Sequence, residues 1–107
     1  MDYSKKELRC HCEYAAREIE DIVKSGDNER FADWAADVLG ERYSINSCLR
    51  YIAVRLTLTC GGPNIYLDTD TGEIEGFWGS DHYAIPVSDD VIAAVDEWYE
   101  DIFDALR

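Results

Sequence analysis

The spacing of apolar residues changes twice along this chain of 107 residues, and this change constrains the fold more than any other feature. Apolar residues first recur every three or four positions, then every second position, and then every three or four positions again. The wider spacing predicts amphipathic helices with one buried stripe, and the spacing of two predicts strands with one buried face. We therefore expect an α+β fold with two N-terminal helices, a three- to four-stranded antiparallel β-meander and a C-terminal acidic amphipathic helix.

The first helix is predicted to begin at a capping box. Ser4 and Glu7 have the spacing at which each side chain satisfies a free backbone N–H group of the first turn. The buried stripe that follows comprises Leu8, Cys12, Ala15, Ile19 and Ile22. Gly26 is expected to end this helix, because glycine readily adopts the left-handed conformation that terminates helices.

A second, shorter helix is predicted after Asp27 or Asn28, either of which can cap its first turn. Its buried stripe comprises Phe31, Trp34, Ala35 and Val38. Gly40 is expected to end this helix, and residues 41–47 are expected to form a polar link to the sheet.

Alternating apolar residues predict the strands of the meander. The clearest alternation is that of Ile52, Val54, Leu56 and Leu58. Turns rich in Gly, Pro and Asp separate the predicted strands from one another. The predicted strands are 51–59, 64–68, 73–78 and, as a weaker fourth strand, 82–87. Pro86 limits the fourth strand to an edge or to a strand end.

A third helix is predicted after Ser88, with Asp89 and Asp90 in its first turn, where the helix dipole favours negative charge. Its buried stripe comprises Val91, Val95, Trp98, Ile102 and Leu106. The opposite side of this helix carries two rows of carboxylates. The rows are Asp90, Glu97, Asp101 and Asp104, and beside them Asp89, Asp96 and Glu100.

Charge is distributed unevenly along the chain. The formal net charge is −13; residues 1–55 carry 11 acidic and 9 basic residues, whereas residues 56–106 carry 12 acidic residues and no Lys or Arg. Like charges four residues apart repel one another on a helix, and a solvated helix ordinarily alternates the two signs. An acidic surface of this kind lowers the stability of the fold. Its presence is explained if it attracts a basic partner. A device for solubility is the alternative explanation.

The carboxylates predict a surface that binds a basic protein. Proteins that bind nucleic acid typically carry such a basic surface, because their Lys and Arg side chains contact the phosphates. By the same electrostatics, the chain is expected not to bind DNA or RNA itself. Phe77 is a candidate aromatic anchor, because it shares a strand face with Glu73 and Glu75; the alternative is that it covers a small apolar cluster. The candidate partner-binding residues are Asp68, Asp70, Glu73, Glu75, Phe77, Asp81, Asp89, Asp90, Asp96, Glu97, Glu100, Asp101 and Asp104.

The sequence predicts no catalytic residue, no metal site and no cofactor. Cys10, His11 and Cys12 are adjacent, whereas metal ligands on a helix are usually three or four residues apart. Residues 68–72 resemble the opening of a calcium-binding loop, but the glycine comes one position too early, so a hairpin turn is expected. His82 belongs to no recognisable nucleophile motif.

The overall pattern resembles small acidic proteins of phages and mobile elements that disarm host defence, namely anti-CRISPR and anti-restriction proteins, several of which mimic DNA. Residues 61–72, residues 75–79 and the acidic helix over 91–106 carry the resemblance, which covers about half of the chain. The resemblance implies a non-enzymatic inhibitor that occupies the DNA-binding surface of a CRISPR effector or a nuclease.

Two other classes of function stay open. One is a general adaptor or antitoxin-like module, in which apolar contacts would dominate binding, and the other is a small enzyme or metal protein. The length and the hydrophobic fraction of 47% predict a single domain over residues 1–107. No apolar stretch suits a signal peptide or a membrane span, so we expect a cytoplasmic protein with free thiols, in a bacterial host cell if a phage encodes it.

Overall fold

The computed structural model describes residues 3–106, with side chains from Lys5 to Leu106. Residues 3–106 form three helices and one five-stranded antiparallel sheet, in which each strand after the first pairs with the strand that precedes it in sequence. The elements are α1 (Tyr3–Ser25), α2 (Asn28–Ala36), β1 (Gly40–Ile45), β2 (Tyr51–Thr59), β3 (Asn64–Asp68), β4 (Glu73–Trp78), β5 (Asp81–Pro86) and α3 (Asp89–Leu106). The predicted α+β class and the three predicted helices are confirmed.

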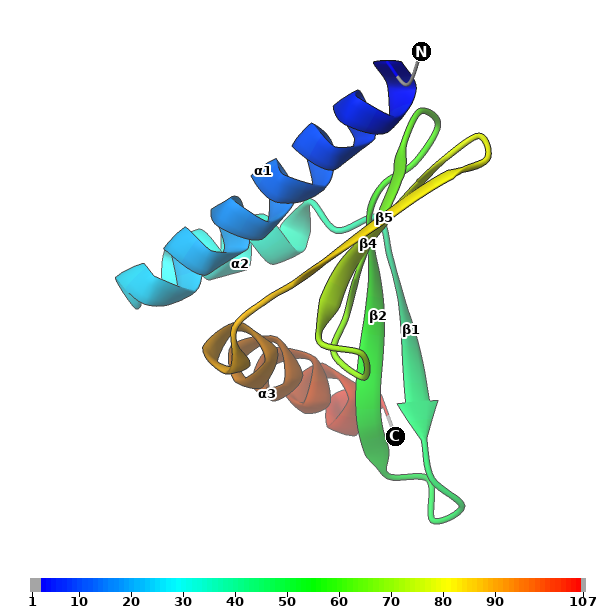
Figure 1. The fold of residues 1–107 in the computed structure, drawn as a ribbon. Coiled ribbons are helices and arrows are strands. Elements are labelled where there is room, and N and C mark those ends of the chain that lie inside the picture. The colour runs from blue at the N-terminus through cyan, green and yellow to red at the C-terminus, as the bar shows by residue number, and fades with distance from the viewer. Residues whose placement is uncertain (1–2, 107) are drawn as a thin grey trace.

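The helices lie together on one side of the sheet, as Figure 1 shows. α1 packs on β4 and β5, α3 packs on β2, and α2 packs beside α1. The other face of the sheet is covered by no helix of the described residues. No helix within residues 3–106 combines the length and the apolar character that crossing a membrane requires.

The helix caps follow from the local sequence. Asp27 Oδ1 accepts hydrogen bonds from two backbone N–H groups in the first turn of α2, at 3.0 and 3.2 Å, which confirms Asp27 as the cap. Ser88 Oγ accepts a hydrogen bond from the N–H group of Val91 at 3.3 Å and caps α3 as predicted. The predicted capping box at Ser4 lies outside the side chains that the structure describes.

β1 overturns three sequence predictions. Residues 41–47 do not form a simple polar link, and the sheet has five strands where three to four are predicted. Gly40 does not end α2, because α2 ends at Ala36 and Gly40 begins β1, opposite Thr57 of β2. β1 is an edge strand with four exposed residues, so burial imposes no apolar alternation that the sequence could display.

A register shift in the β1–β2 pair overturns the predicted position of Ile52. The pairing slips by one residue next to Ile45 and Tyr51. As a result Ile52 is 52% exposed, and the ring of Tyr51 packs against Phe103 of α3 with 6.2 Å between the ring centroids. A one-residue bulge changes which side of the sheet the residues beyond it face, and apolar spacing alone does not reveal it.

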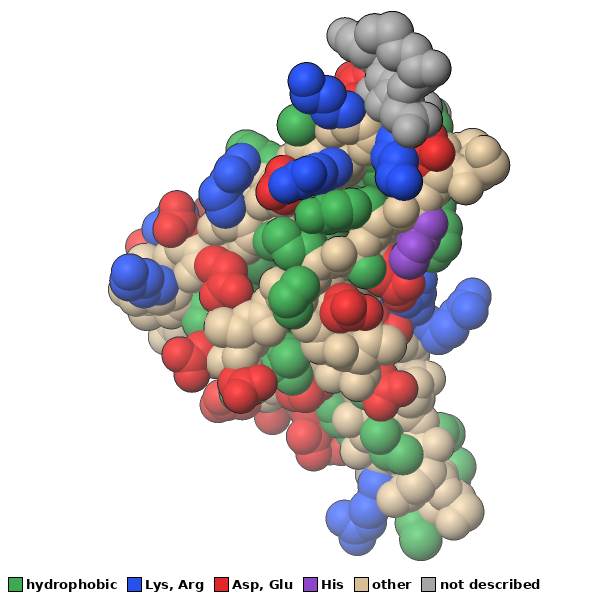
Figure 2. All heavy atoms as spheres, in the orientation of Figure 1, with side chains coloured by type: hydrophobic (Ala, Val, Ile, Leu, Met, Phe, Trp, Pro, Cys, Tyr) green, Lys and Arg blue, Asp and Glu red, His purple; other side chains and the backbone are tan. Residues whose placement is uncertain are grey.

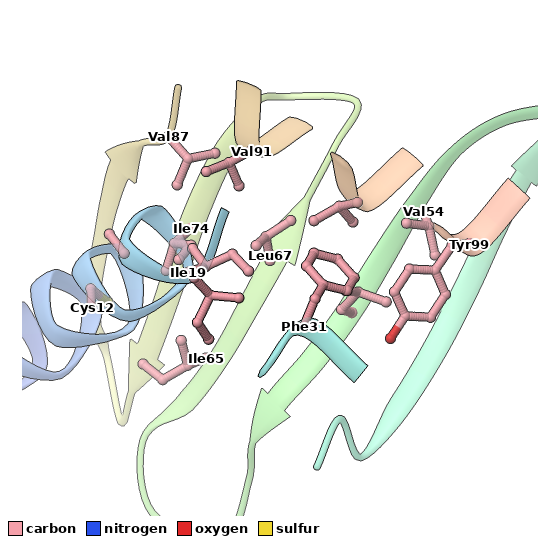
Figure 3. Close-up of a cluster of buried hydrophobic side chains, with 14 of the residues drawn as sticks. Cys12, Ile19, Phe31, Val54, Ile65, Leu67, Ile74, Val87, Val91 and Tyr99 are labelled. Carbon is pink, nitrogen blue, oxygen red and sulfur yellow. The ribbon is translucent and has the colours of Figure 1, made fainter. Parts of the chain in front are cut away.

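The core fills the space between the sheet and the helices (Figure 3). Its fully buried side chains include Leu8, Cys12 and Ile19 from α1, Leu56, Ile65, Leu67 and Ile74 from the sheet, and Val91, Val95 and Tyr99 from α3. α1 can approach β4 closely because position 76 is glycine. A Cβ atom at Gly76 would lie 2.8 Å from Leu8 Cδ1 and even closer to Cys12 Sγ.

Two predictions about turns and edges are also confirmed. Residues 68–72 form the β3–β4 hairpin turn, in which the N–H group of Gly72 donates to Asp68 O at 2.9 Å and Gly72 has a φ of 73°. The weaker fourth strand is β5, which pairs with β4 at the edge of the sheet and has Pro86 as its last residue.

Candidate partner-binding surface

α3 carries seven of the 13 predicted partner-binding residues, six of them on its exposed outer side. Val91, Val95 and Tyr99 hold its inner side in the core. Its exposed carboxylates are those of Asp89, Asp90, Glu97, Glu100, Asp101 and Asp104. Figure 2 shows acidic side chains gathered over α3, whereas basic side chains follow α1. Leu106, predicted on the buried stripe, is 72% exposed in the last turn of α3.

The density of negative charge along α3 is close to that of one DNA strand. α3 contains 18 residues and seven carboxylates. At a rise of about 1.5 Å per residue the helix is about 27 Å long, which gives about one carboxylate per 4 Å. One strand of B-DNA carries about one phosphate per 3.4 Å of helix axis. The linear density of carboxylates on α3 is therefore comparable to that of phosphates on one DNA strand, and six of the seven carboxylates are exposed.

Asp96 differs from the other carboxylates of α3, because it is half-buried and bonded to the sheet. The hydroxyl group of Tyr51 donates a hydrogen bond to Asp96 Oδ1 at 2.5 Å. Burial, together with this hydrogen bond, raises the pKa of Tyr51 above its ordinary value, so the phenol keeps its proton. Asp96 thus positions α3 against β2 and contributes less to the exposed acidic row.

The N-terminal end of α3 is tied to α1. Glu20 accepts hydrogen bonds from the backbone N–H group of Ser88 at 2.8 Å and from Ser88 Oγ at 2.7 Å. Together with the Tyr51–Asp96 bond, this contact fixes α3 at its start and in its middle. The exposed carboxylates are therefore displayed on an element whose position is fixed by contacts within the chain.

Asp68, Glu73, Glu75 and Phe77 lie on the face of the sheet that no described helix covers. Ile74, which alternates with them on β4, is fully buried on the helix side. The prediction that Glu73, Glu75 and Phe77 share one strand face is therefore confirmed. This face is on the other side of the sheet from α3, so the fold does not join these residues and α3 into one surface.

Arg55 of β2 neutralises part of the acidic charge on the uncovered face. Its Nη1 atom lies 2.9 Å from Asp68 Oδ2 and 2.9 Å from Glu75 Oε1. The hydrogen bond from Arg55 lowers the pKa of Glu75, and the contact between His82 Nε2 and Glu75 Oε2, at 3.2 Å, acts in the same direction. The sequence prediction missed both Arg55 and His82, although Arg55 lies on the polar side of the predicted strand 51–59.

Phe77 contacts other rings on the uncovered face of the sheet. Its ring centroid lies 4.7 Å from that of His82 and 6.1 Å from that of Tyr66. The guanidinium group of Arg55 lies over the Tyr66 ring at 4.4 Å. These contacts favour the alternative stated for Phe77, in which it covers a small cluster on the sheet.

The remaining predicted residues, Asp70 and Asp81, lie at turns on opposite ends of β4. Asp68 Oδ1 accepts a hydrogen bond from the N–H group of Asp70 at 2.8 Å, so Asp68 also shapes the β3–β4 turn. Asp81 begins β5 and lies opposite Trp78. The predicted residues are therefore divided among α3, the uncovered sheet face and two turns, and α3 holds the largest group.

The Cys10-His11-Cys12 run is split between the surface and the core. Cys12 is buried, which raises the pKa of its thiol to about 11, and His11 contacts Trp78 with 6.2 Å between ring centroids. The exposed thiols are those of Cys10, Cys48 and Cys60, and all four cysteines are free. Within residues 3–106, no three His, Cys, Asp or Glu side chains are grouped so that they could hold a metal ion.

The fold and the surface together define a class: a small α+β protein whose C-terminal helix displays an acidic row on a rigid support. Comparison of the chain with protein-family models, with curated proteins and with solved structures finds no match. A function must therefore be inferred from the residues of this chain.

Proposed function

We propose that this protein is a non-enzymatic inhibitor that blocks a basic, nucleic-acid-binding host-defence protein by presenting α3 in place of DNA. A phage-encoded protein of the anti-CRISPR type, with a CRISPR effector or a nuclease as its partner, is the function that this surface supports best. The observation that carries the proposal is the exposed acidic row of α3, which lies within residues 56–106, where the chain has no Lys or Arg.

Two physical features support DNA mimicry over a purely solubilising role. The carboxylates are packed along α3 at nearly the density of phosphates on a DNA strand, although a helix that only needs solubility can alternate its charges. The buried contacts of Tyr99 and the hydrogen bonds of Glu20 and Asp96 also hold the row in one arrangement, which lowers the entropic cost of binding. The interaction is expected to weaken as salt rises, because exposed ion pairs are screened.

One observation favours a second candidate, an adaptor that binds through apolar contacts. Ile45, Leu49 and Ile52 are all exposed around the β1–β2 hairpin. Leu49 also has a φ of 61°, a conformation that suits glycine better than leucine. A partner held by these side chains would stay bound at high salt, which distinguishes the adaptor from the DNA mimic.

Competition with DNA tests the proposal directly. The protein would be immobilised, exposed to lysates of bacterial hosts at low salt, and eluted first with duplex DNA and then with salt, and the eluted proteins would be identified by mass spectrometry. We expect a nucleic-acid-binding defence protein to be released by duplex DNA. The variant with Glu97, Glu100, Asp101 and Asp104 all changed to Lys should fold and should lose this partner.

The matched control changes the net charge equally but leaves α3 intact. In this control Glu7, Asp21, Glu29 and Glu41, which are all exposed outside α3, are changed to Lys. The control should keep the partner that the α3 variant loses. Equal loss in both variants would show that bulk charge and not the α3 row attracts the partner, and undiminished binding by the folded α3 variant would refute DNA mimicry.

A further inference from the structure

A cleft lies between α1 and α2 where they pass over β2 and β3. Its volume is about 550 Å³, within the range of sites that bind small groups. The apolar residues that line it include Ile22 of α1, Trp34 of α2, Val38 of the segment between α2 and β1, Leu58 of β2 and Ile65 of β3. Ile22 and Ile65 are buried, and Trp34 and Leu58 are half-buried, so the floor of the cleft is apolar and belongs to the packed core.

The position of α2 explains why this cleft stays open. The buried ring of Phe31 anchors α2 toward α3, with 5.1 Å between the ring centroids of Phe31 and Trp98. Trp34 and Ala35 of this nine-residue helix also pack against the core. The side of α2 that bears Trp34 then faces α1 across the cleft.

The cleft has an acidic rim above its apolar floor. Glu18 of α1, Asp33 of α2 and Asp37, which caps the C-terminal end of α2, line it and are exposed. Arg30 and His11 also line the cleft. None of these side chains is in an ion pair with another residue among those that the structure describes. Three carboxylates against one guanidinium, in a chain with a net charge of −13, favour a positively charged occupant.

We infer that this cleft binds a lysine or arginine side chain that a protein partner presents. The long aliphatic stem of such a side chain can lie on Ile22, Trp34 and Leu58, while its cationic end reaches Asp33 and Asp37 at the rim. Trp34 adds a ring face, which attracts cations. The identity of the partner rests on the proposed function, because a protein that binds nucleic acid exposes many such side chains.

The test uses two small probes that differ only in charge. The probes are N-acetyl-lysine methylamide and N-acetyl-norleucine methylamide, which share an aliphatic stem but only the first of which carries an ammonium group. Each would be titrated into the protein while backbone amide and tryptophan indole N–H shifts are recorded by NMR. We expect the lysine probe to shift the Trp34 indole and the Leu58 amide, and the norleucine probe to bind about fivefold more weakly or worse.

Variants at the rim supply the second arm of the test. Asp33→Asn and Asp37→Asn should each weaken the lysine probe by about twofold to fivefold, the loss of one partly exposed ion pair. Asp21→Asn, at an exposed position of α1 that does not line the cleft, is the matched control and should leave binding unchanged. Equal binding of both probes, equal effects of all three variants, or shifts concentrated on α3 would overturn the inference.

The cleft inference and the DNA-mimic proposal can be refuted independently of each other. The α3 variant with four Lys substitutions should still bind the lysine probe, because none of its changes lies in the cleft. If the lysine probe binds but DNA releases no captured partner, the cleft inference is supported and the DNA-mimic proposal fails. If the probe does not bind, the cleft inference fails whatever the capture experiment shows.

Discussion

Gly76 sets the distance between α1 and the sheet. Gly76→Ala should destabilise the fold by about 1 to 3 kcal/mol, because the new methyl group would collide with Leu8 and Cys12 in a packed core. Urea unfolding measures the change. Gly62→Ala is the control, since no atom lies within 4 Å of the Cβ position there, and it should change stability by about 0.5 kcal/mol at most. Equal stability of the two variants would mean that α1 does not lie this close to β4.

Glu75 should make the stability depend on pH in the acidic range. Its pKa is lowered in the folded state by the hydrogen bond from Arg55, so the unfolded chain takes up the proton first as pH falls. The stabilisation is complete above the unfolded pKa, about 4.3, and is lost as pH falls through the lower folded pKa.

Glu75→Gln should therefore lower stability near neutral pH and reduce the loss of stability on acidification below about pH 4.5. Urea unfolding of the native and variant proteins at several pH values measures both effects. Arg55→Met removes the other partner of the pair and should reduce the acid dependence in the same way. A variant whose stability falls with acid as steeply as that of the native protein would show that this pair does not contribute.

At the scale of elements, repulsion within the acidic row of α3 is expected to lower the stability of the fold. Asp101→Lys should stabilise the fold by about 0.5 to 1 kcal/mol, because the new Lys replaces repulsion of Glu97 at i−4 and Asp104 at i+3 by attraction. Asp101→Asn, which only removes the repulsion, should give a smaller gain. Thermal and urea unfolding at low salt would measure both. If the Lys variant is no more stable than the native protein, repulsion within the row does not lower the free energy of unfolding.

The helices and the central strands could be predicted from the sequence, because buried positions are apolar and recur at a regular spacing. Buried strand residues must be apolar to fill the core, and their spacing of two within a strand, as between Val54 and Leu56, therefore identifies the central strands. β1 has no such requirement, since its pairing with β2 is made by the backbone and its side chains are largely exposed. Tyr43 and the turn residue Asn46 are the signals that could have indicated a strand followed by a hairpin.

At the scale of the whole molecule, the chain separates its charges in space as well as in sequence. The acidic row of α3 could be predicted, because helical spacing places its carboxylates together whatever the rest of the fold. The pairing of Arg55 with Asp68 and Glu75 could not, because it depends on the register of three strands. The candidate site is consequently smaller than the sequence suggests, and it is centred on α3.

The order of the meander has a consequence for how this protein is made. Each strand pairs with the strand before it, so the sheet can grow one hairpin at a time as the chain leaves the ribosome. α1 emerges first, yet Leu8 and Cys12 pack at Gly76 on β4, and α1 also packs on β5, which ends at Pro86. The apolar stripe of α1 therefore cannot pack on β4 and β5 until more than half of the chain has been synthesised, and α3 follows later still.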